Sequence, residues 1–255
     1  MTSDRGDAGA ARTTGTADTS RIHGSVPDLG TLTELQDAFL GSVDAVAPGT
    51  RVPWCGRWRV RHLVVHLARI HHWAAGQARR RQETPLGRGP FVLADLYAAQ
   101  AADLRETLGT LDPDAEAWTL DDSRVVRFWH RRQVHETLVH LWDLRTAGGL
   151  PLDAPADLWA DTVDEVVTVM QPRQVRLGRA APPPGRVRLE ATDAGRTWAV
   201  EAAPGAAAGP VVEVTGPAQV LALLLWGRTT TADARLRVTG GHDVLDALLA
   251  GRVTP

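Results

Sequence analysis

The chain has 255 residues, of which 44% are hydrophobic and 23% charged, a composition typical of globular proteins and unlike that of collagen-like, coiled-coil or disordered chains. Its 28 basic and 30 acidic residues give a formal net charge of -2, which argues against a dedicated nucleic-acid-binding protein. The length allows one large domain or two modest ones.

The cysteine and lysine content limits the kinds of metal site and catalytic mechanism that the chain can have. Cys55 is the only cysteine, so neither an internal disulfide nor a cysteine-rich zinc finger can form, as expected for a reducing compartment. Every basic residue is arginine, a bias typical of a GC-rich genome, and the absence of lysine excludes mechanisms that need a catalytic lysine. Any metal would therefore be held mainly by histidine, aspartate or glutamate.

Hydrophobicity predicts neither a targeting segment nor a membrane span. Residues 1–22 are rich in Thr, Ala, Gly, Asp and Ser and contain no apolar run, so we predict a disordered tail without the hydrophobic core of a signal peptide. The longest apolar run, residues 220–226, is far too short to cross a bilayer. We therefore expect a cytoplasmic protein with no membrane partner.

Residues 23–177 are predicted to form a helical bundle. Apolar periodicity, interrupted by Pro and Gly, predicts helices at residues 31–47, 57–81, 91–109, 123–147 and 155–173. The fifth begins with proline and acidic residues, as a helix N-terminus should. The long connections between the first four allow up-down packing with one loop crossing an end.

Residues 178–255 are predicted to form a small α+β domain. Short β-branched segments separated by turn signals predict strands, and the predicted order is strands 187–191, 197–201 and 211–214, helix 217–227, strand 235–239 and helix 243–250. The predicted fold class is therefore α+β, with an N-terminal four-helix bundle followed by a small C-terminal α/β domain.

The second predicted helix places one histidine on its apolar face. His66 shares this face with Leu63, Leu67 and Ile70, at helical spacings of three and four residues. A histidine in such a position is most often a hydrogen-bonded core residue. The neighbouring histidines at positions 62, 71 and 72 cannot all serve one site with it, because they project in different directions.

The fourth predicted helix carries the densest polar and aromatic stretch. Glu136 and His140 are four residues apart, so their side chains can converge on one ion. A zincin motif is absent, since His135 and His140 are five apart rather than four. The helical wheel also allows a plain alternative, because Glu136 and His140 lie with Arg132 and Asp143 opposite an apolar stripe, as on a solvated face.

The second and fourth predicted helices together supply a set of metal ligands that neither helix supplies alone. His66 on one helix with Glu136 and His140 on another supplies the two histidines and one carboxylate of a catalytic zinc site with an open position. We therefore predict a divalent-metal site, most simply for zinc, at these three residues.

Four segments carry a family resemblance. They are VPWCGRWRVRHLVVHLARIHHWA (52–74), FWHRRQVHETLVHLWD (128–143), VTGPAQVLALLLWGR (214–228) and GGHDVLDALLAG (240–251). In this order the segments resemble the mycothiol-dependent maleylpyruvate isomerases and their DinB-like thiol-transferase relatives, over most of the chain. Arg59 and His62 depart from the family, which commonly has a Thr or Ser helix cap and an acidic residue at these positions.

The resemblance implies an activity and a set of site residues. It makes His66, Glu136 and His140 the metal ligands, and Arg228 an anion-binding catalytic arginine contributed by the small domain. It implies mycothiol as the thiol cosubstrate of an isomerase or S-transferase, in which a zinc-bound thiolate attacks a small electrophile, as in maleylpyruvate cis-trans isomerisation. The arginine-only bias agrees with an actinobacterial, mycothiol-producing source. The expected partners are a small-molecule substrate and a low-molecular-weight thiol, and the expected assembly is a monomer or homodimer.

Two other functions use the same residues. The protein could be a non-catalytic DinB-like module with a structural metal, or a metal-dependent hydrolase that activates water. Cys55 precedes the second helix, where its pKa could fall, but the neighbouring Trp54 and Trp58 favour a buried structural role. Arg131 and Arg132 are explained equally well by carboxylate binding and by a solvated helix face.

Overall fold

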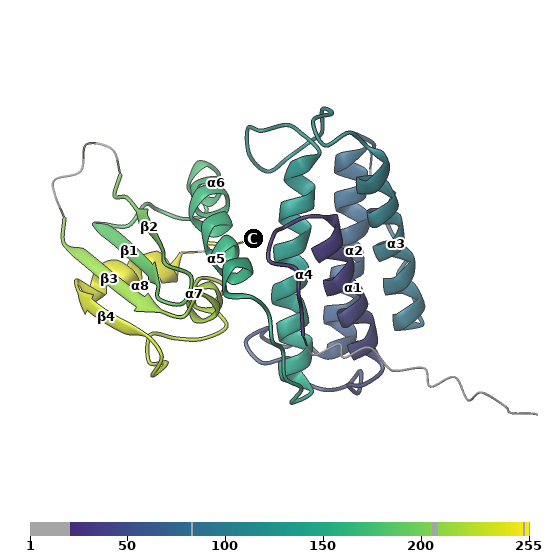
Figure 1. Ribbon diagram of the computed structural model, residues 1–255, viewed down its shortest axis with the longest axis horizontal. Helices are drawn as coiled ribbons and strands as arrows, with labels where there is room; N and C mark the ends of the chain where they lie inside the picture. The colour runs from purple at the N-terminus through teal and green to yellow at the C-terminus, as the bar shows by residue number, and fades with distance from the viewer. Residues whose placement is uncertain (1–20, 83, 204, 206–208, 252, 255) are drawn as a thin grey trace, which may run out of the picture.

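The computed structural model describes residues 21–82, 84–203, 205, 209–251 and 253–254, and Figure 1 shows a helical half beside a half that contains a small sheet. The helical half is a bundle of α1 (Leu29–Val43), α2 (Val60–Ala78), α3 (Leu93–Thr110) and α4 (Arg127–Ala147). Both α1 and α2 pack against α3 and α4. The predicted four-helix bundle is confirmed.

Capping residues explain where the first two helices begin. The Oδ1 atom of Asp28 accepts a hydrogen bond of 2.8 Å from the Thr31 amide, so α1 begins two residues before the predicted start. At α2, the backbone N–H of Arg59 donates to Nδ1 of His62 over 3.0 Å. The histidine thus satisfies an amide at a helix start that has no Ser or Thr cap.

The start of α4 differs from the prediction. Ser123 was expected to open this helix, but its amide and hydroxyl both donate to Oδ1 of Asp121 in a turn. The next residue, Arg124, has a φ of 55°, in the left-handed region that ends any right-handed helix. The helix therefore begins at Arg127.

A long, interrupted helix follows the bundle. It consists of α5 (Ala156–Glu165), a π-helical turn η1 (Val166–Met170) and α6 (Gln171–Arg176), so it continues three residues beyond the predicted end. The wider turn ends at Met170, two residues before Pro172, which has no N–H to donate to the preceding turn. Periodicity predicted the helix but not its π-helical turn.

The C-terminal half contains a four-stranded sheet in the order β2-β1-β3-β4. The strands are β1 (Arg186–Ala191), β2 (Arg196–Val200), β3 (Val211–Gly216) and β4 (Arg237–Gly240). β1 pairs antiparallel with β2 and parallel with β3, and β3 pairs antiparallel with β4. The parallel strands β1 and β3 are joined by a crossover connection that contains β2. Helix α7 (Ala218–Leu225) follows β3, and helix α8 (His242–Ala250) follows β4. The predicted α+β class is confirmed.

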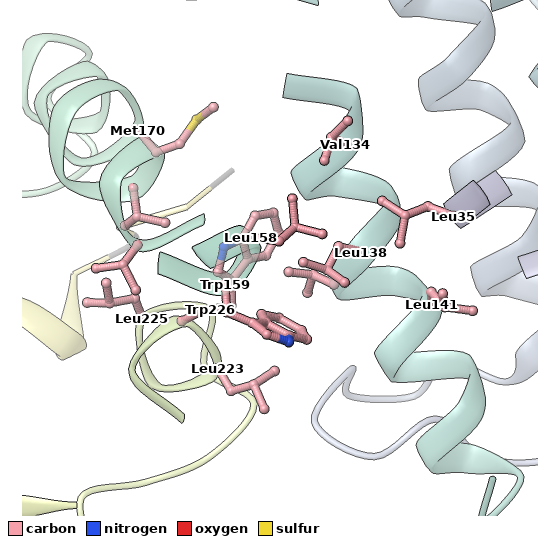
Figure 2. Close-up of a cluster of buried hydrophobic side chains, with 14 of the residues drawn as sticks. Leu35, Val134, Leu138, Leu141, Leu158, Trp159, Met170, Leu223, Leu225 and Trp226 are labelled. Atoms are coloured by element: carbon pink, nitrogen blue, oxygen red, sulfur yellow. The ribbon is translucent and has the colours of Figure 1, made fainter. Parts of the chain in front are cut away.

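One hydrophobic core joins the two halves. Figure 2 shows Leu138 of α4 facing Trp159 of α5 and Trp226, which follows α7, and all three are buried. α5 also packs against α7, and in Figure 1 α5 and α6 lie between the bundle and the sheet. As a result α4 is covered by bundle helices on one side and by the C-terminal half on the other.

An ion network crosses the same boundary. Asp164 of α5 accepts hydrogen bonds from Arg131 of α4 over 2.6 Å and from Arg196 and the Trp198 indole of β2 over 3.1 and 3.0 Å. Polar contacts of this kind fix orientation, because an alternative arrangement would leave these groups unpaired. The arrangement of the two halves around α4 is therefore specified by both apolar and polar contacts.

The N-terminal segment is described only in part. Residues 1–20 of the expected tail 1–22 lie outside the described residues. Arg21 forms an ion pair of 2.8 Å with Asp153, and Ile22 is 3% exposed, with its amide bonded to the Asp153 carbonyl. Among the described residues, no helix is both long enough and apolar enough to cross a membrane.

Candidate metal centre and pocket

The three predicted ligand residues meet between two helices. His66 comes from α2, whereas Glu136 and His140 come from successive turns of α4, and one potential ligand atom from each lies within 4.8 Å of the others. The Oε1 atom of Glu136 is 3.5 Å from Nε2 of His66 and 3.2 Å from Nε2 of His140. Two imidazole nitrogens and a carboxylate oxygen therefore point to one spot, and this donor set fits a divalent cation of the zinc type.

The solvated-face interpretation of α4 is wrong. Arg132, Glu136 and His140 are 4%, 6% and 3% exposed, although the helical wheel places them opposite the apolar stripe. The reason is tertiary: Glu165 of α5 bonds Arg132, and the Trp226 ring after α7 lies 5.4 Å from the Arg132 guanidinium carbon and 6.4 Å from the His140 ring, so both segments cover this polar side of α4. Buried charges must be paired, so each of these groups has specific partners.

Glu136 is held in its ionised form. Arg132 donates from Nη2 to its Oε2 atom, while Nη1 of the same guanidinium donates to Glu165 of α5 over 2.6 Å. Burial alone would raise the pKa of Glu136, but Arg132 and hydrogen bonds from His140 and His66 outweigh it and hold the pKa well below its usual value. The carboxylate is thus ready to bind a cation through Oε1.

His140 is oriented by a buried carboxylate. Its Nδ1 atom donates to Oδ2 of Asp143 over 2.9 Å, which leaves Nε2 turned toward Glu136. Burial lowers the pKa of His140, but the hydrogen bonds to Asp143 and Glu136 raise it more, so the net shift is upward. A carboxylate on the second ring nitrogen is the usual support of a metal-binding histidine.

Arg228 completes this chain of contacts. Its Nε and Nη2 atoms donate to the two carboxylate oxygens of Asp143 over 3.2 and 2.9 Å, and Nη1 donates to the Trp226 carbonyl over 2.6 Å. Nη2 also lies 3.6 Å from Sγ of Cys55. Four of the five guanidinium N–H bonds therefore have partners within the chain, and one on Nη1 is left for a ligand.

Cys55 lies beside this pair but is not activated. Burial, followed by the charge of Asp143, raises its pKa to about 12, so the thiol stays protonated at neutral pH. The expected burial applies to Cys55 and Trp58, which are partly buried, whereas Trp54 is 54% exposed.

A pocket of about 760 Å³ opens beside the three ligand residues. Its wall combines apolar and basic side chains from both halves of the molecule. The lining residues are Trp54, Cys55, Trp58, His66, Ile70, Trp73, Leu120, Arg132, Gln133, Glu136, His140, Arg173, Arg179, Trp226 and Arg228. All four residues predicted for the site line this one pocket.

The other histidines of these helices serve different roles. His71 is buried, with Nδ1 donating to Gln133 over 2.8 Å, and His72 contacts Gln100 over 3.1 Å. His135 lies 2.8 Å from Asp161. None of the three belongs to the described cluster of possible metal ligands. Trp129 is fully buried and packs against the rings of Trp73 and Phe128.

Several site residues carried no clear signal in the sequence. Glu165 reaches Arg132 from α5, and Gln133 and Arg173 line the pocket. Asp143 could be seen on the same helix face as His140, at a spacing of three residues, but its bond to Arg228 joins positions 85 residues apart. Periodicity within one helix contains no information on such pairs.

Comparisons with known proteins find relatives for most of the chain. The family model described as the mycothiol maleylpyruvate isomerase N-terminal domain matches residues 29–145, and the model described as the MDMPI C-terminal domain matches residues 153–247. No curated protein sequence matches the chain.

Two solved structures share the fold. The crystal structure of a mycothiol-dependent maleylpyruvate isomerase matches with a TM-score of 0.58 at 16% identity, and that of a mutant form with a TM-score of 0.59 at 15% identity. Each alignment covers 84% of this chain and 92% of the other. The likeness at this identity concerns the fold.

Proposed function

Because this chain belongs to the mycothiol-dependent maleylpyruvate isomerase family, a family of enzymes, we propose that it catalyses a thiol-dependent reaction at the cluster of His66, Glu136 and His140. The cosubstrate would be mycothiol, and the reaction would be cis-trans isomerisation of a small electrophile such as maleylpyruvate, or S-transfer to one. The observation that carries the proposal is the convergence of two imidazoles and one ionised carboxylate beside a pocket of about 760 Å³.

The three side chains would hold a divalent cation, most simply zinc. When bound there, the cation would stabilise a thiolate relative to its thiol at neutral pH. The protein prepares for this in two ways: Arg132 keeps Glu136 ionised, and Asp143 fixes the ring of His140 with Nε2 toward the site. Arg132 and Asp143 are both buried, so water does not compete for their hydrogen bonds to Glu136 and His140.

The isomerisation needs a nucleophile that can also leave. The thiol cosubstrate, as its thiolate, adds to one carbon of the activated cis double bond, forming a C–S bond and leaving a carbanion stabilised by the adjacent carbonyl. Rotation about the resulting C–C single bond and elimination of the thiolate give the trans isomer. No atom of the protein is consumed, so its contribution is to enclose and orient the two reactants.

Arg228 would act at the edge of this reaction. Its unused Nη1 N–H can donate to a substrate oxygen, while its bidentate bond to Asp143 links the small domain to the support of His140. We therefore keep Arg228 in the proposed site, as a residue with one donor for the substrate and a positioning role through Asp143.

Metal content and thiol-dependent turnover test this function together. We expect about one zinc per purified chain, and we expect His140→Ala to lose both the metal and mycothiol-dependent isomerisation of maleylpyruvate. His72→Ala is the matched control, because His72 lies on α2 but contacts Gln100 and the Thr84 carbonyl instead of the cluster. Full turnover by a metal-free His140→Ala variant would refute the proposal.

Two further measurements on the same protein separate the alternative functions from the proposed one. A non-catalytic module would lose thermal stability on metal removal without any change in a thiol reaction. A hydrolase would turn over esters or amides with no added thiol. Either result would replace the isomerase or S-transferase assignment.

A further inference from the structure

The four arginines of the pocket fall into two pairs with different surroundings. Arg132 is neutralised by Glu136 and Glu165, and Arg228 by both oxygens of Asp143. These two guanidinium groups are therefore largely occupied by carboxylates of the chain itself.

The second pair has no such partners. Arg173 lies on α6 and Arg179 follows shortly after it, and neither side chain forms a hydrogen bond or ion pair with a residue in the part of the chain that the structure describes. Arg173 is partly buried, and burial together with the charges of Arg179, Arg176 and Arg132 lowers its pKa. Positive charge is thus concentrated at the pocket without compensation.

Two neutral donors of the pocket wall also lack acceptors. Nε2 of Gln133 and Nε1 of Trp226 are buried and have no hydrogen-bond partner among the described residues, and both residues line the pocket. The Gln133 amide is fixed in this orientation because its Oε1 atom accepts from Nδ1 of His71 over 2.8 Å. A buried donor without an acceptor is unfavourable, so a ligand oxygen would relieve both.

We propose that Arg173 and Arg179, aided by the free N–H groups of Gln133 and Trp226, form the anion-recognition side of the pocket and bind the carboxylates of a small dicarboxylate substrate. The inference rests on the proposed function, since maleylpyruvate carries two carboxylates. Each guanidinium can bind a carboxylate through two parallel N–H bonds. Substrate recognition is thereby assigned chiefly to α6 and the turn after it.

A neighbouring groove supplies the matched control. It has a volume of about 890 Å³, shares Trp58 and His66 with the pocket, and is also basic, with Arg61 and Arg69 of α2 in its wall. Among its described lining residues, no buried polar atom lacks a partner. The groove therefore has a positively charged wall like that of the pocket, but it lacks the unpaired buried donors.

The test measures binding without turnover. Maleate, a cis-dicarboxylate, is titrated by calorimetry into metal-loaded and metal-stripped protein, with inorganic phosphate and the neutral maleamide in parallel. The variants are Arg173→Gln with Arg179→Gln, and as control Arg61→Gln with Arg69→Gln. Circular dichroism and thermal unfolding establish that each variant is folded, which we expect because these side chains are exposed or partly buried.

We expect the Arg173/Arg179 double variant to bind maleate at least about ten-fold more weakly, in both metal states, since each charge-assisted pair contributes on the order of ten-fold. The control double variant should bind within about two-fold of the wild type, and maleamide should not distinguish the proteins. In turnover, KM should rise about ten-fold while kcat changes little.

Three outcomes would overturn the inference: unchanged maleate binding in the Arg173/Arg179 variant, a loss confined to the Arg61/Arg69 variant, or phosphate binding more tightly than maleate. The proposed function is judged separately. Maleate binding that depends on these arginines, without any mycothiol-dependent turnover, would support this inference and refute the isomerase assignment. Mycothiol-dependent turnover that is unchanged in the Arg173/Arg179 variant would support the assignment and refute this inference.

Discussion

Asp143 is the residue whose neutralisation should reveal most about the proposed metal centre. It is fully buried, accepts from Nδ1 of His140 over 2.9 Å, and accepts from Arg228 over 2.9 and 3.2 Å. Burial raises its pKa, but the bonds from His140 and Arg228 lower it more, so the group is an anion in the folded protein. Asp143→Asn keeps the size of the side chain and removes its charge.

Two separate effects follow from this substitution. The support of His140 weakens, and changes to such supporting carboxylates typically reduce metal affinity by about 10–100-fold, or about 1.4–2.7 kcal/mol. Arg228, whose side chain is 14% exposed, loses its charged partner, which should lower the free energy of unfolding of the metal-free protein by about 2–3 kcal/mol. Zinc affinity is measured by competition with a chromophoric chelator and stability by urea unfolding.

Asp103→Asn is the matched control. Asp103 also binds an arginine through both oxygens, with Arg79 donating over 2.6 and 3.0 Å, but the pair is partly exposed and neither side chain bonds a residue of the cluster. We expect a loss of stability below about 1 kcal/mol and no change in zinc affinity. Wild-type zinc affinity in Asp143→Asn would refute the argument that this carboxylate supports a metal ligand.

Two further predictions concern His71, which is buried behind Gln133 of the pocket wall, and Cys55, which is partly buried and lines the pocket. Burial lowers the pKa of His71 from 6.5 to about 4. Between these two pH values His71 is therefore protonated in the unfolded chain but neutral in the folded one. As the pH falls from 6.5 to 4, the free energy of unfolding should decrease by about 3 kcal/mol. Urea unfolding of His71→Gln should show a flatter pH dependence than His72→Gln, and identical slopes would contradict this. The pKa of Cys55 is raised to about 12, so the folded protein should react with iodoacetamide at neutral pH far more slowly than a free thiol, and Cys55→Ala should retain thiol-dependent turnover. Loss of turnover in that variant would assign the reacting sulfur to the protein.

The fold could be predicted because its signals are local. Apolar residues at helical spacing identified the bundle, and alternating strands between turn residues identified the sheet, since both patterns follow from one face being buried. The errors arose where backbone conformation depended on single residues, as at Arg124 before α4 and at Pro172 after the π-helical turn.

The cluster of His66, Glu136 and His140 could be predicted only in part. The spacing of Glu136 and His140 indicated a shared ion, but the same spacing was compatible with a solvated face. Only the covering of α4 by α5 and Trp226 excludes the solvated face. The partners of Arg228 and Arg132 are long-range pairs, so the sequence could not show that both are occupied. The family resemblance implied Arg228 as the anion-binding arginine, and no pattern in the sequence pointed to Arg173.

The proposed site is divided between the two halves of the molecule. The bundle alone contains His66, Glu136 and His140, yet Arg132, which keeps Glu136 ionised, is balanced by Glu165 of α5. Without that carboxylate, Arg132 would have only Glu136 as its anionic partner and would compete more strongly with a cation for it. The C-terminal half therefore does more than line the pocket: because Glu165 shares Arg132 with Glu136, the Glu136 carboxylate would be freer to bind the proposed cation.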